Sequence, residues 1–255
     1  MTDKYSCFEH LSANESRGAD YEIVRRLGIS EIAVIGIHGG GIEPGTSEIA
    51  EAVAGPDHSF YTLKGLKEEA NKDLHITSTK FDEPEAREIV RRSKTVISIH
   101  GCSEAEEIVF LGGLDTALSR CIEEKLKQAG FKTSLTKKDG KFRRLRGRNK
   151  RNICNRCGRG MGVQLEISKG LRARLLRHED TETRRRGEKT GAERVGTAQE
   201  TVWKDAGGNP SGALPMLGQR VVPMPGRRFP SGTLADFVRA VREAIEEYRS
   251  GKCGA

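Results

Sequence analysis

Apolar residues along the chain form two kinds of segment, and the two kinds alternate. In the first kind, short runs are apolar on both faces and rich in β-branched residues, which indicates strands at the centre of a covered sheet. These runs occupy residues 20–27, 31–37, 60–66, 74–77, 95–99, 108–111 and 162–168. In the second kind, apolar residues return about every three to four positions, as on one face of a helix. These segments cover residues 47–54, 83–92, 114–129, 170–176 and 233–248.

Strands that alternate with helices predict an α/β fold. We expect a single domain over residues 1–255, with a mixed or mostly parallel sheet flanked by helices. Two segments fall outside the pattern. Residues 137–159 carry eleven Lys or Arg and almost no apolar periodicity, which predicts a basic loop. Residues 178–232 are polar and include five of the eight prolines, so we expect an irregular polar insertion there.

The charge balance narrows the choice of partners. The chain has 44 Lys and Arg against 36 Asp and Glu, and the formal net charge of +8 favours polyanions such as nucleic acid, acidic polymers or anionic surfaces. No apolar run approaches the ~18 residues of a membrane-spanning helix, and the first residues lack a signal-peptide pattern. We therefore expect a protein that is synthesised in the cytoplasm without a signal peptide and binds no membrane. Release from the cell would then occur by lysis. We also expect the protein to be a monomer.

Six cysteines are scattered along the chain: Cys7, Cys102, Cys121, Cys154, Cys157 and Cys253. Small secreted proteins held together by disulfides have densely spaced cysteines instead. We therefore expect free thiols in a reducing compartment.

Two histidines directly follow predicted strands. His38 comes after V-I-G-I and His100 after T-V-I-S-I, and a glycine follows each of them. In open α/β sheets, ligands bind at the carboxyl ends of the strands. A single histidine at such a place is more often a packed core residue, but two of them favour a shared ligand-binding site.

Glu43 is separated from His38 by G-G-G-I. Glycines permit a tight turn, so the carboxylate can return towards the imidazole. Two imidazoles and one carboxylate are the three-ligand set of a catalytic zinc site, in which a fourth position remains for water or substrate. Two other interpretations stay open. Glu43 can complement the N-terminus of the following helix, and the glycines can cradle a phosphate, although the G-x-G-x-x-G spacing is absent.

Glu166 lies inside the apolar strand predicted at residues 162–168, on the same face as Gln164. A buried carboxylate needs a partner or a chemical purpose. Glu166 either forms a salt bridge with one of the many arginines or acts as a general base towards a metal-bound water.

These motifs resemble the poly-γ-glutamate hydrolases of phages and bacteria, whose fold is similar to that of zinc carboxypeptidases. The resemblance rests on H-G-G-G-I-E-P-G-T-S-E-I-A, on S-I-H-G, and on N-I-C-N-R followed by G-V-Q-L-E-I-S, and it covers roughly residues 4–176 and the last helix. It implies one zinc ion held by His38, Glu43 and His100, with Glu166 as the catalytic base. It also implies a polyanionic γ-glutamyl polymer as the substrate. The chain departs from the family pattern in the second cysteine of C-N-R-C and in the length and charge of the two irregular segments.

A positive group should face the substrate carboxylates or the oxyanion of the tetrahedral intermediate. Arg156, with Asn155 beside it, is the candidate for substrate binding, because a guanidinium can hold a carboxylate through two hydrogen bonds. Against this, most arginines in so basic a chain are solvated surface charges.

Two other functions are compatible with the sequence. The first is nucleic-acid binding, with the basic loop at 137–159 as the contact surface and Cys154 and Cys157 as half of a zinc knuckle. No second pair of ligands completes that knuckle, and the two histidines and Glu43 stay unexplained, which argues against nucleic acid. The second is a zinc carboxypeptidase or N-acyl amidohydrolase acting on small acidic substrates, which the sequence distinguishes poorly from a polymer hydrolase.

Overall fold

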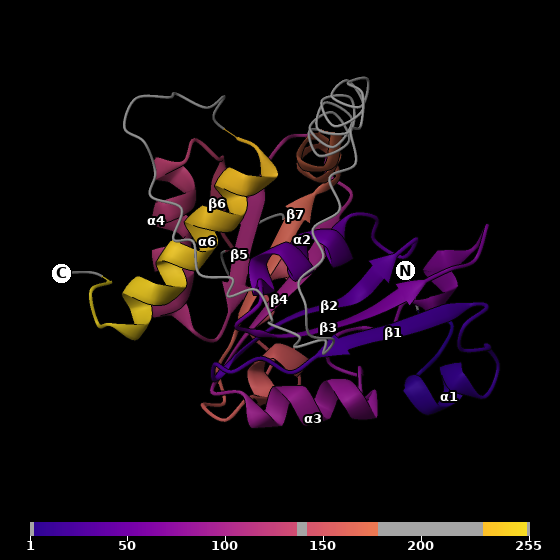
Figure 1. The fold of residues 1–255 in the computed structure, drawn as a ribbon. Coiled ribbons are helices and arrows are strands. Elements are labelled where there is room, and N and C mark those ends of the chain that lie inside the picture. The colour runs from indigo at the N-terminus through magenta and orange to yellow at the C-terminus, as the bar shows by residue number, and fades with distance from the viewer. Residues whose placement is uncertain (1–2, 137–141, 178–231, 254–255) are drawn as a thin grey trace, which may run out of the picture. The chain divides into compact units, whose positions relative to one another are not determined.

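The computed structural model describes residues 3–136, 142–177 and 232–253. These residues belong to one compact unit, made of Met1–Glu179 and Ser231–Ala255. Among them, seven strands form one mixed sheet with helices on both faces (Figure 1). The predicted α/β fold class is thereby confirmed. The single domain over residues 1–255 stays a prediction, because nearly all of the expected insertion at 178–232 and part of the basic loop lie outside the described residues.

The sheet places four parallel strands at its centre. Its strands are β1 (Tyr21–Arg26), β2 (Ile32–Gly40), β3 (Ser59–Gly65), β4 (Thr95–Cys102), β5 (Val109–Gly113), β6 (Thr133–Leu135) and β7 (Val163–Ser168). Their order is β1-β3-β2-β4-β7-β5-β6. Strands β3, β2, β4 and β7 run parallel to one another, while β1 and β5 are antiparallel to their neighbours β3 and β7. The carboxyl ends of β2, β4 and β7 therefore meet at one edge, where α/β proteins bind ligands.

Two apolar cores lie on opposite faces of the sheet. One core contains residues of α2 (Thr46–Ala54), α4 (Thr116–Gln128) and α6 (Leu234–Arg249), joined by Leu171 and Leu175 of the helical residues 169–177. The other contains residues of α1 (Phe8–Ser12), α3 (Pro84–Arg92) and the 3-10 turns η1 (Asn71–Leu74) and η3 (Ile153–Arg156). Figure 1 shows α3 on the opposite side of the sheet from α2, α4 and α6.

Local capping signals fix the starts of the long helices. Asp115 accepts a hydrogen bond from Leu118 N at the start of α4, and Thr233 and Asp236 form a capping box before α6. Glu83 caps α3, whose first residue is a proline. Such residues satisfy the backbone N–H groups that a helix leaves free at its N-terminus. No helix in the described parts of the chain is long and apolar enough to cross a membrane.

One predicted strand is wrong. Residues 74–77 form no strand, because Leu74 ends η1 and Ile76 lies in irregular backbone. Both side chains are buried in the core beside α3, so the apolar pattern here indicates burial rather than a strand that pairs with a neighbouring strand. The carbonyl of Ile76 is bonded to the ring of His38 instead of to a neighbouring strand. A short apolar run cannot by itself distinguish these two cases.

The expectation of six free thiols is wrong for two cysteines. Cys121 of α4 and Cys253, which follows α6, form a disulfide with their Cα atoms 5.8 Å apart. The two residues are 132 positions apart, so their spacing in the sequence did not indicate a pair. They meet because α4 and α6 pack in the same core. The other four cysteines, Cys7, Cys102, Cys154 and Cys157, are free.

Candidate metal centre and active site

His38 and His100 face one another across two neighbouring strands. Each lies two residues before the end of its strand, His38 in β2 and His100 in β4, and both are buried. Because β2 and β4 are parallel, their carboxyl ends place the rings side by side. The two Nδ1 atoms are 3.2 Å apart. The two histidines singled out by the sequence pattern thus share one site.

A tight glycine turn returns Glu43 to the same place. Gly40 and Gly45 have φ values of 57° and 92°, which side chains rarely allow, and the N–H of Glu43 donates to the carbonyl of His38 at 2.9 Å. Glu43 Oε1 lies 3.2 Å from His38 Nδ1, and Oε2 lies 3.9 Å from His100 Nδ1. Oε2 also accepts a hydrogen bond from Gly101 N at 2.7 Å. The carboxylate therefore faces β4 rather than the first turn of α2.

The second nitrogen of each ring has a partner that fixes its orientation. His38 Nε2 lies 2.9 Å from the carbonyl of Ile76. A carbonyl can only accept, so Nε2 carries a proton and, in the neutral ring, Nδ1 presents its lone pair to the site. His100 Nε2 lies 2.8 Å from Ser98 Oγ. Metal-bound histidines are usually held in this way. Two Nδ1 atoms and one carboxylate thus converge, and this set of donors fits Zn²⁺.

The protonation of the cluster follows from burial and from the charges inside it. Burial lowers the pKa of His100 to about 3, and a charged His38 acts in the same direction. Burial opposes ionisation of Glu43, but the neighbouring His38 outweighs it and lowers the pKa of Glu43 to about 2. Burial also acts to lower the pKa of His38, yet the charge of Glu43 raises it. The raised pKa of His38 favours a proton on its ring beside the charged Glu43, and a divalent cation would take the place of that proton.

Glu166 stands beside the histidines on the next strand. β7 pairs with β4 in the register that sets Glu166 opposite His100, and paired residues point to the same face of a sheet. The carboxylate is buried, and it forms no ion pair with a described Lys or Arg, so the salt-bridge interpretation has no support in this part of the chain. Burial, and then the negative charge of Glu43, raises the pKa of Glu166 to about 8.

A pair of buried amides holds Glu166 in place. Gln164 Nε2 donates to Glu166 Oε1 at 2.7 Å, and Asn152 Nδ2 donates to Gln164 Oε1 at 2.8 Å. Asn152 is fixed in turn, because its Oδ1 accepts from Cys154 N at 3.2 Å. The series leaves the Gln164 amide only one favourable orientation, with its nitrogen towards Glu166. Asn152 is the residue of the N-I-C-N-R motif that reaches the site, and sequence reasoning missed it.

His75 is a second residue at the site that sequence reasoning missed. Its ring lies 4.1 Å from the ring of His38, centroid to centroid, with 31° between the planes. Its Nδ1 is 2.8 Å from Asp3 Oδ1, and Asp3 also accepts from Thr77 N at 2.9 Å. His38, Glu43 and His75 can each offer a ligand atom such that all three lie within 4.8 Å of one another. A lone histidine in an irregular segment carries no periodic signal, so nothing in the sequence marked it.

Asn155 and Arg156 lie differently from the other candidates. Asn155 is buried and its amide is saturated by backbone groups, since the oxygen accepts two N–H groups and the nitrogen donates to two carbonyls. These partners, at 2.7 to 3.2 Å, are the N–H groups of Leu114 and Gly162 and the carbonyls of Gly147 and Asn149. Arg156 is exposed at the end of η3. Their role in substrate binding stays a prediction.

Cys154 and Cys157 are packed into the core beside α3. Cys157 Sγ donates to the carbonyl of Met161 at 3.2 Å. Among the described residues, no cluster able to hold a metal ion includes either cysteine. The zinc knuckle therefore lacks further ligands in the described part of the chain.

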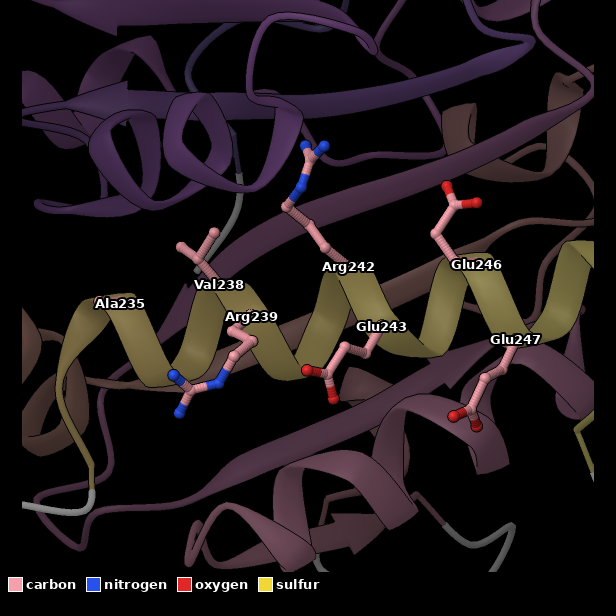
Figure 2. Close-up of a pocket in the computed structure, with 7 residues that line it drawn as sticks. All are labelled: Ala235, Val238, Arg239, Arg242, Glu243, Glu246 and Glu247. Carbon is pink, nitrogen blue, oxygen red and sulfur yellow. The ribbon is translucent and has the colours of Figure 1, made fainter. Parts of the chain in front are cut away.

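A surface hollow along α6 is separate from the metal cluster. Its volume is about 610 Å³ (Figure 2), and it is lined by Ala235, Val238, Arg239, Arg242, Glu243, Glu246 and Glu247. Arg242 is already engaged there, since it donates to the carbonyls of Val53 and Ala54. None of the lining residues is a site candidate, so converging side chains at the sheet edge, rather than this hollow, define the candidate site.

The sequence is similar to those of known proteins. Residues 5–197 match the family described as poly-gamma-glutamate hydrolase. Over 174 residues the chain is 40% identical to the UPF0714 protein YndL of Bacillus subtilis (strain 168), and it is 39% identical to the SPbeta prophage-derived UPF0714 protein YoqZ of the same organism. Both matches cover 68% of this chain, and they cover 67% of YndL and 62% of YoqZ. The chain thus spans about two thirds or slightly less of these relatives.

The fold is similar to two solved structures. A bacteriophage poly-gamma-glutamate hydrolase superposes with a TM-score of 0.71 at 28% identity, over 98% of this chain and 99% of that one. The zinc-free form of YndL superposes with a TM-score of 0.64 at 40% identity, over 68% of this chain and 84% of that one.

Proposed function

Because the chain belongs to the poly-gamma-glutamate hydrolase family, we propose that it is a zinc-dependent hydrolase that cleaves the γ-glutamyl amide linkages of poly-γ-glutamate. One observation carries the proposal. The Nδ1 atoms of His38 and His100 and the carboxylate of Glu43 converge, and Glu166 lies directly beside His100. The existence of a zinc-free form of YndL supports zinc as the metal.

We assign one zinc ion to His38, Glu43 and His100. When bound, the ion supplies a Lewis acid that polarises a carbonyl and lowers the pKa of a coordinated water towards about 7. The protein orients the three ligands through Ile76, Ser98 and the N–H of Gly101. Such support sets ligand geometry and strengthens metal binding.

Glu166 is the proposed general base and acid. Gln164 binds one of its oxygens, which leaves the other to take a proton from water and to return it to the departing amine. Phe110 of β5 pairs with Glu166 from the side opposite His100 and is buried. This apolar neighbour keeps bulk water away from the carboxylate.

The charge of the segment beside the site favours an anionic substrate. Residues 142–162 contain no Asp or Glu, and the segment contacts the site where Leu145 O accepts from Gln164 Nε2 at 3.4 Å. Its exposed cations that form no ion pair with a described residue are Arg143, Arg144, Arg148, Lys150, Arg151 and Arg156. Several unpaired positive charges so close together in the chain attract polyanions. Arg156 would contact substrate carboxylates there, and Asn155 would hold the loop backbone.

Metal analysis and polymer digestion test the proposal together. The purified protein should contain one zinc per chain, and it should depolymerise γ-polyglutamate but not α-polyglutamate. EDTA should abolish the activity and added zinc should restore it. Glu166→Gln should keep zinc but lose hydrolysis, whereas His38→Ala should lose both. His58→Gln is the matched control, because His58 is a buried histidine that contacts Ser30 away from this cluster.

The other outcomes of these experiments are also informative. Full hydrolysis by Glu166→Gln or by the metal-free protein would contradict the proposal. Cleavage of short γ-glutamyl or N-acyl substrates, with the polymer left intact, would favour the small-substrate amidohydrolase. Nucleic-acid binding would be favoured if replacing Cys154 and Cys157 with serine removed both zinc and binding to DNA or RNA.

A further inference from the structure

Arg172 is a buried cation next to the site that the proposed reaction does not use. It lies on the helical residues 169–177, and only 7% of its surface is exposed. It forms no ion pair with any described carboxylate. A charged side chain is almost never this buried unless it is paired, because an unpaired buried charge is costly. The placement of Arg172 therefore needs a structural reason.

Three main-chain carbonyls take the place of an acidic partner. Arg172 Nε donates to Pro44 O at 2.7 Å, and Nη1 donates to Cys102 O at 3.3 Å and also to Ile167 O. Burial lowers the pKa of Arg172, while the charge of Glu43 acts in the opposite direction. The guanidinium is thus stabilised by carbonyl dipoles and by the negative charge of the site.

Each of these carbonyls belongs to a segment that carries a proposed site residue. The first belongs to the residue after Glu43, the second lies two residues after His100, and the third belongs to the residue after Glu166. The three segments are far apart in the sequence, yet one guanidinium is bonded to all of them. A planar guanidinium donates in fixed directions, so the bonds constrain how far the segments can separate.

Gly101 leaves room for this side chain. A Cβ on Gly101 would collide with the guanidinium of Arg172, and no other residue would be among its three nearest contacts. The N–H of Gly101 is also the donor to Glu43. Gly101 thus allows the strand carrying His100 to approach Arg172 on one side and Glu43 on the other.

We propose that Arg172 is a positioning residue that fixes the spacing of the Glu43, His100 and Glu166 segments and thereby sets the affinity of the site for its metal. The inference rests on the proposed function only in taking that metal to be zinc. Arg172 forms no hydrogen bond or ion pair with the proposed ligand atoms among the described residues, so it acts through the backbone that carries them.

Zinc affinity, measured by competition with a chelator, is the primary test. Arg172→Met keeps the length of the side chain but removes its three bonds, and Arg172→Lys keeps the charge but cannot reach three carbonyls at once. Both should weaken zinc binding by about 10- to 100-fold, which is typical when a group that supports metal ligands is lost. Gly101→Ala should have the same effect, because it displaces the guanidinium without removing it.

Two matched controls separate positioning from general damage. Arg174→Met changes an arginine of the same helix whose guanidinium lies 3.0 Å from Glu107 and over the ring of Phe131. Gly158→Ala adds a methyl group where the nearest atom is 3.4 Å away. Both controls should keep wild-type zinc affinity. The melting temperature of each metal-free protein, compared with its zinc-loaded form, reports stability separately from affinity.

The result that would overturn the inference is wild-type zinc affinity in Arg172→Met or, if that variant does not fold, in Gly101→Ala. Recovery of full affinity by Arg172→Lys would assign the effect to charge instead of positioning and would also contradict it. Failure of the proposed function is distinguishable, because then the unaltered protein would not cleave γ-polyglutamate, whereas failure of this inference leaves zinc binding and cleavage by the unaltered protein intact.

Discussion

The chain contains two sets of residues whose types commonly bind zinc, and the fold places the two sets in different environments. His38, Glu43 and His100 lie at the carboxyl edge of the sheet, with the Nδ1 atom of His38 3.2 Å from both the Nδ1 atom of His100 and a Glu43 oxygen. Cys154 and Cys157 lie in the core beside α3, where burial raises the pKa of Cys154. A buried thiol stays protonated and binds metal poorly. The position of a residue in the fold thus matters more for metal binding than its type.

The largest expected effect separates the two sets directly. His100→Ala should remove zinc and lower kcat/KM on γ-polyglutamate by roughly 10³-fold or more, since metal polarisation is worth several kcal/mol. Metal content and initial rates of the same preparation measure this. The double replacement of Cys154 and Cys157 by serine should leave the zinc content unchanged. Zinc lost from the serine variant and retained in His100→Ala would reverse the comparison.

A second effect concerns the amides that support the edge of the sheet. Gln164→Leu removes the donor to Glu166 and should lower kcat by about 10- to 100-fold while zinc content and KM change little, because the base loses its fixed orientation. Gln128→Leu is the matched control, since Gln128 is an exposed glutamine at the end of α4 whose amide donates to Glu124. An unchanged kcat in Gln164→Leu would show that Glu166 needs no support.

The cysteine region should respond through stability alone. Cys154→Ser places a hydroxyl at a fully buried position and should lower the free energy of unfolding by about 1–3 kcal/mol. Denaturant unfolding of the metal-free protein measures this loss. Cys7→Ser, at a partly exposed free cysteine, is the control and should be close to neutral. A fall in zinc affinity with unchanged stability would give the cysteines a ligand role.

The smallest expected effect is on substrate capture by the basic segment around those cysteines. Replacing Arg148 and Arg151 with glutamine should raise KM for the polymer by about two- to threefold at low salt, and the difference should vanish at high salt because charge attraction is screened. Arg91→Gln with Arg120→Gln removes equal charge from exposed positions of α3 and α4 and should leave KM unchanged. Equal effects of the two pairs would mean that only net charge matters.

The parts of the molecule that could be predicted from the sequence are those that depend on periodic or local patterns. The apolar runs before His38 and His100 predicted strand ends, and glycines before Glu43 predicted the turn that brings it back. His75, Asn152 and Arg172 were not predictable, because irregular backbone or a long side chain brings them to the site from distant segments. The disulfide between Cys121 and Cys253 was not predictable either, because its two cysteines come from distant segments.

The order of strands also governs when the site can exist. β7 lies between β4 and β5, two strands that precede it in the chain, so during synthesis it joins the sheet after both of its neighbours have been made. Until it does, Glu166 has no fixed place beside His100, although β2 and β4 can already bring the two histidines together. Arg172 also follows β7 in the chain, so neither Glu166 nor the side chain proposed to position the metal ligands is available before β7 has been made. A chain that ends before β7 should therefore lack hydrolysis and bind zinc more weakly than the whole chain.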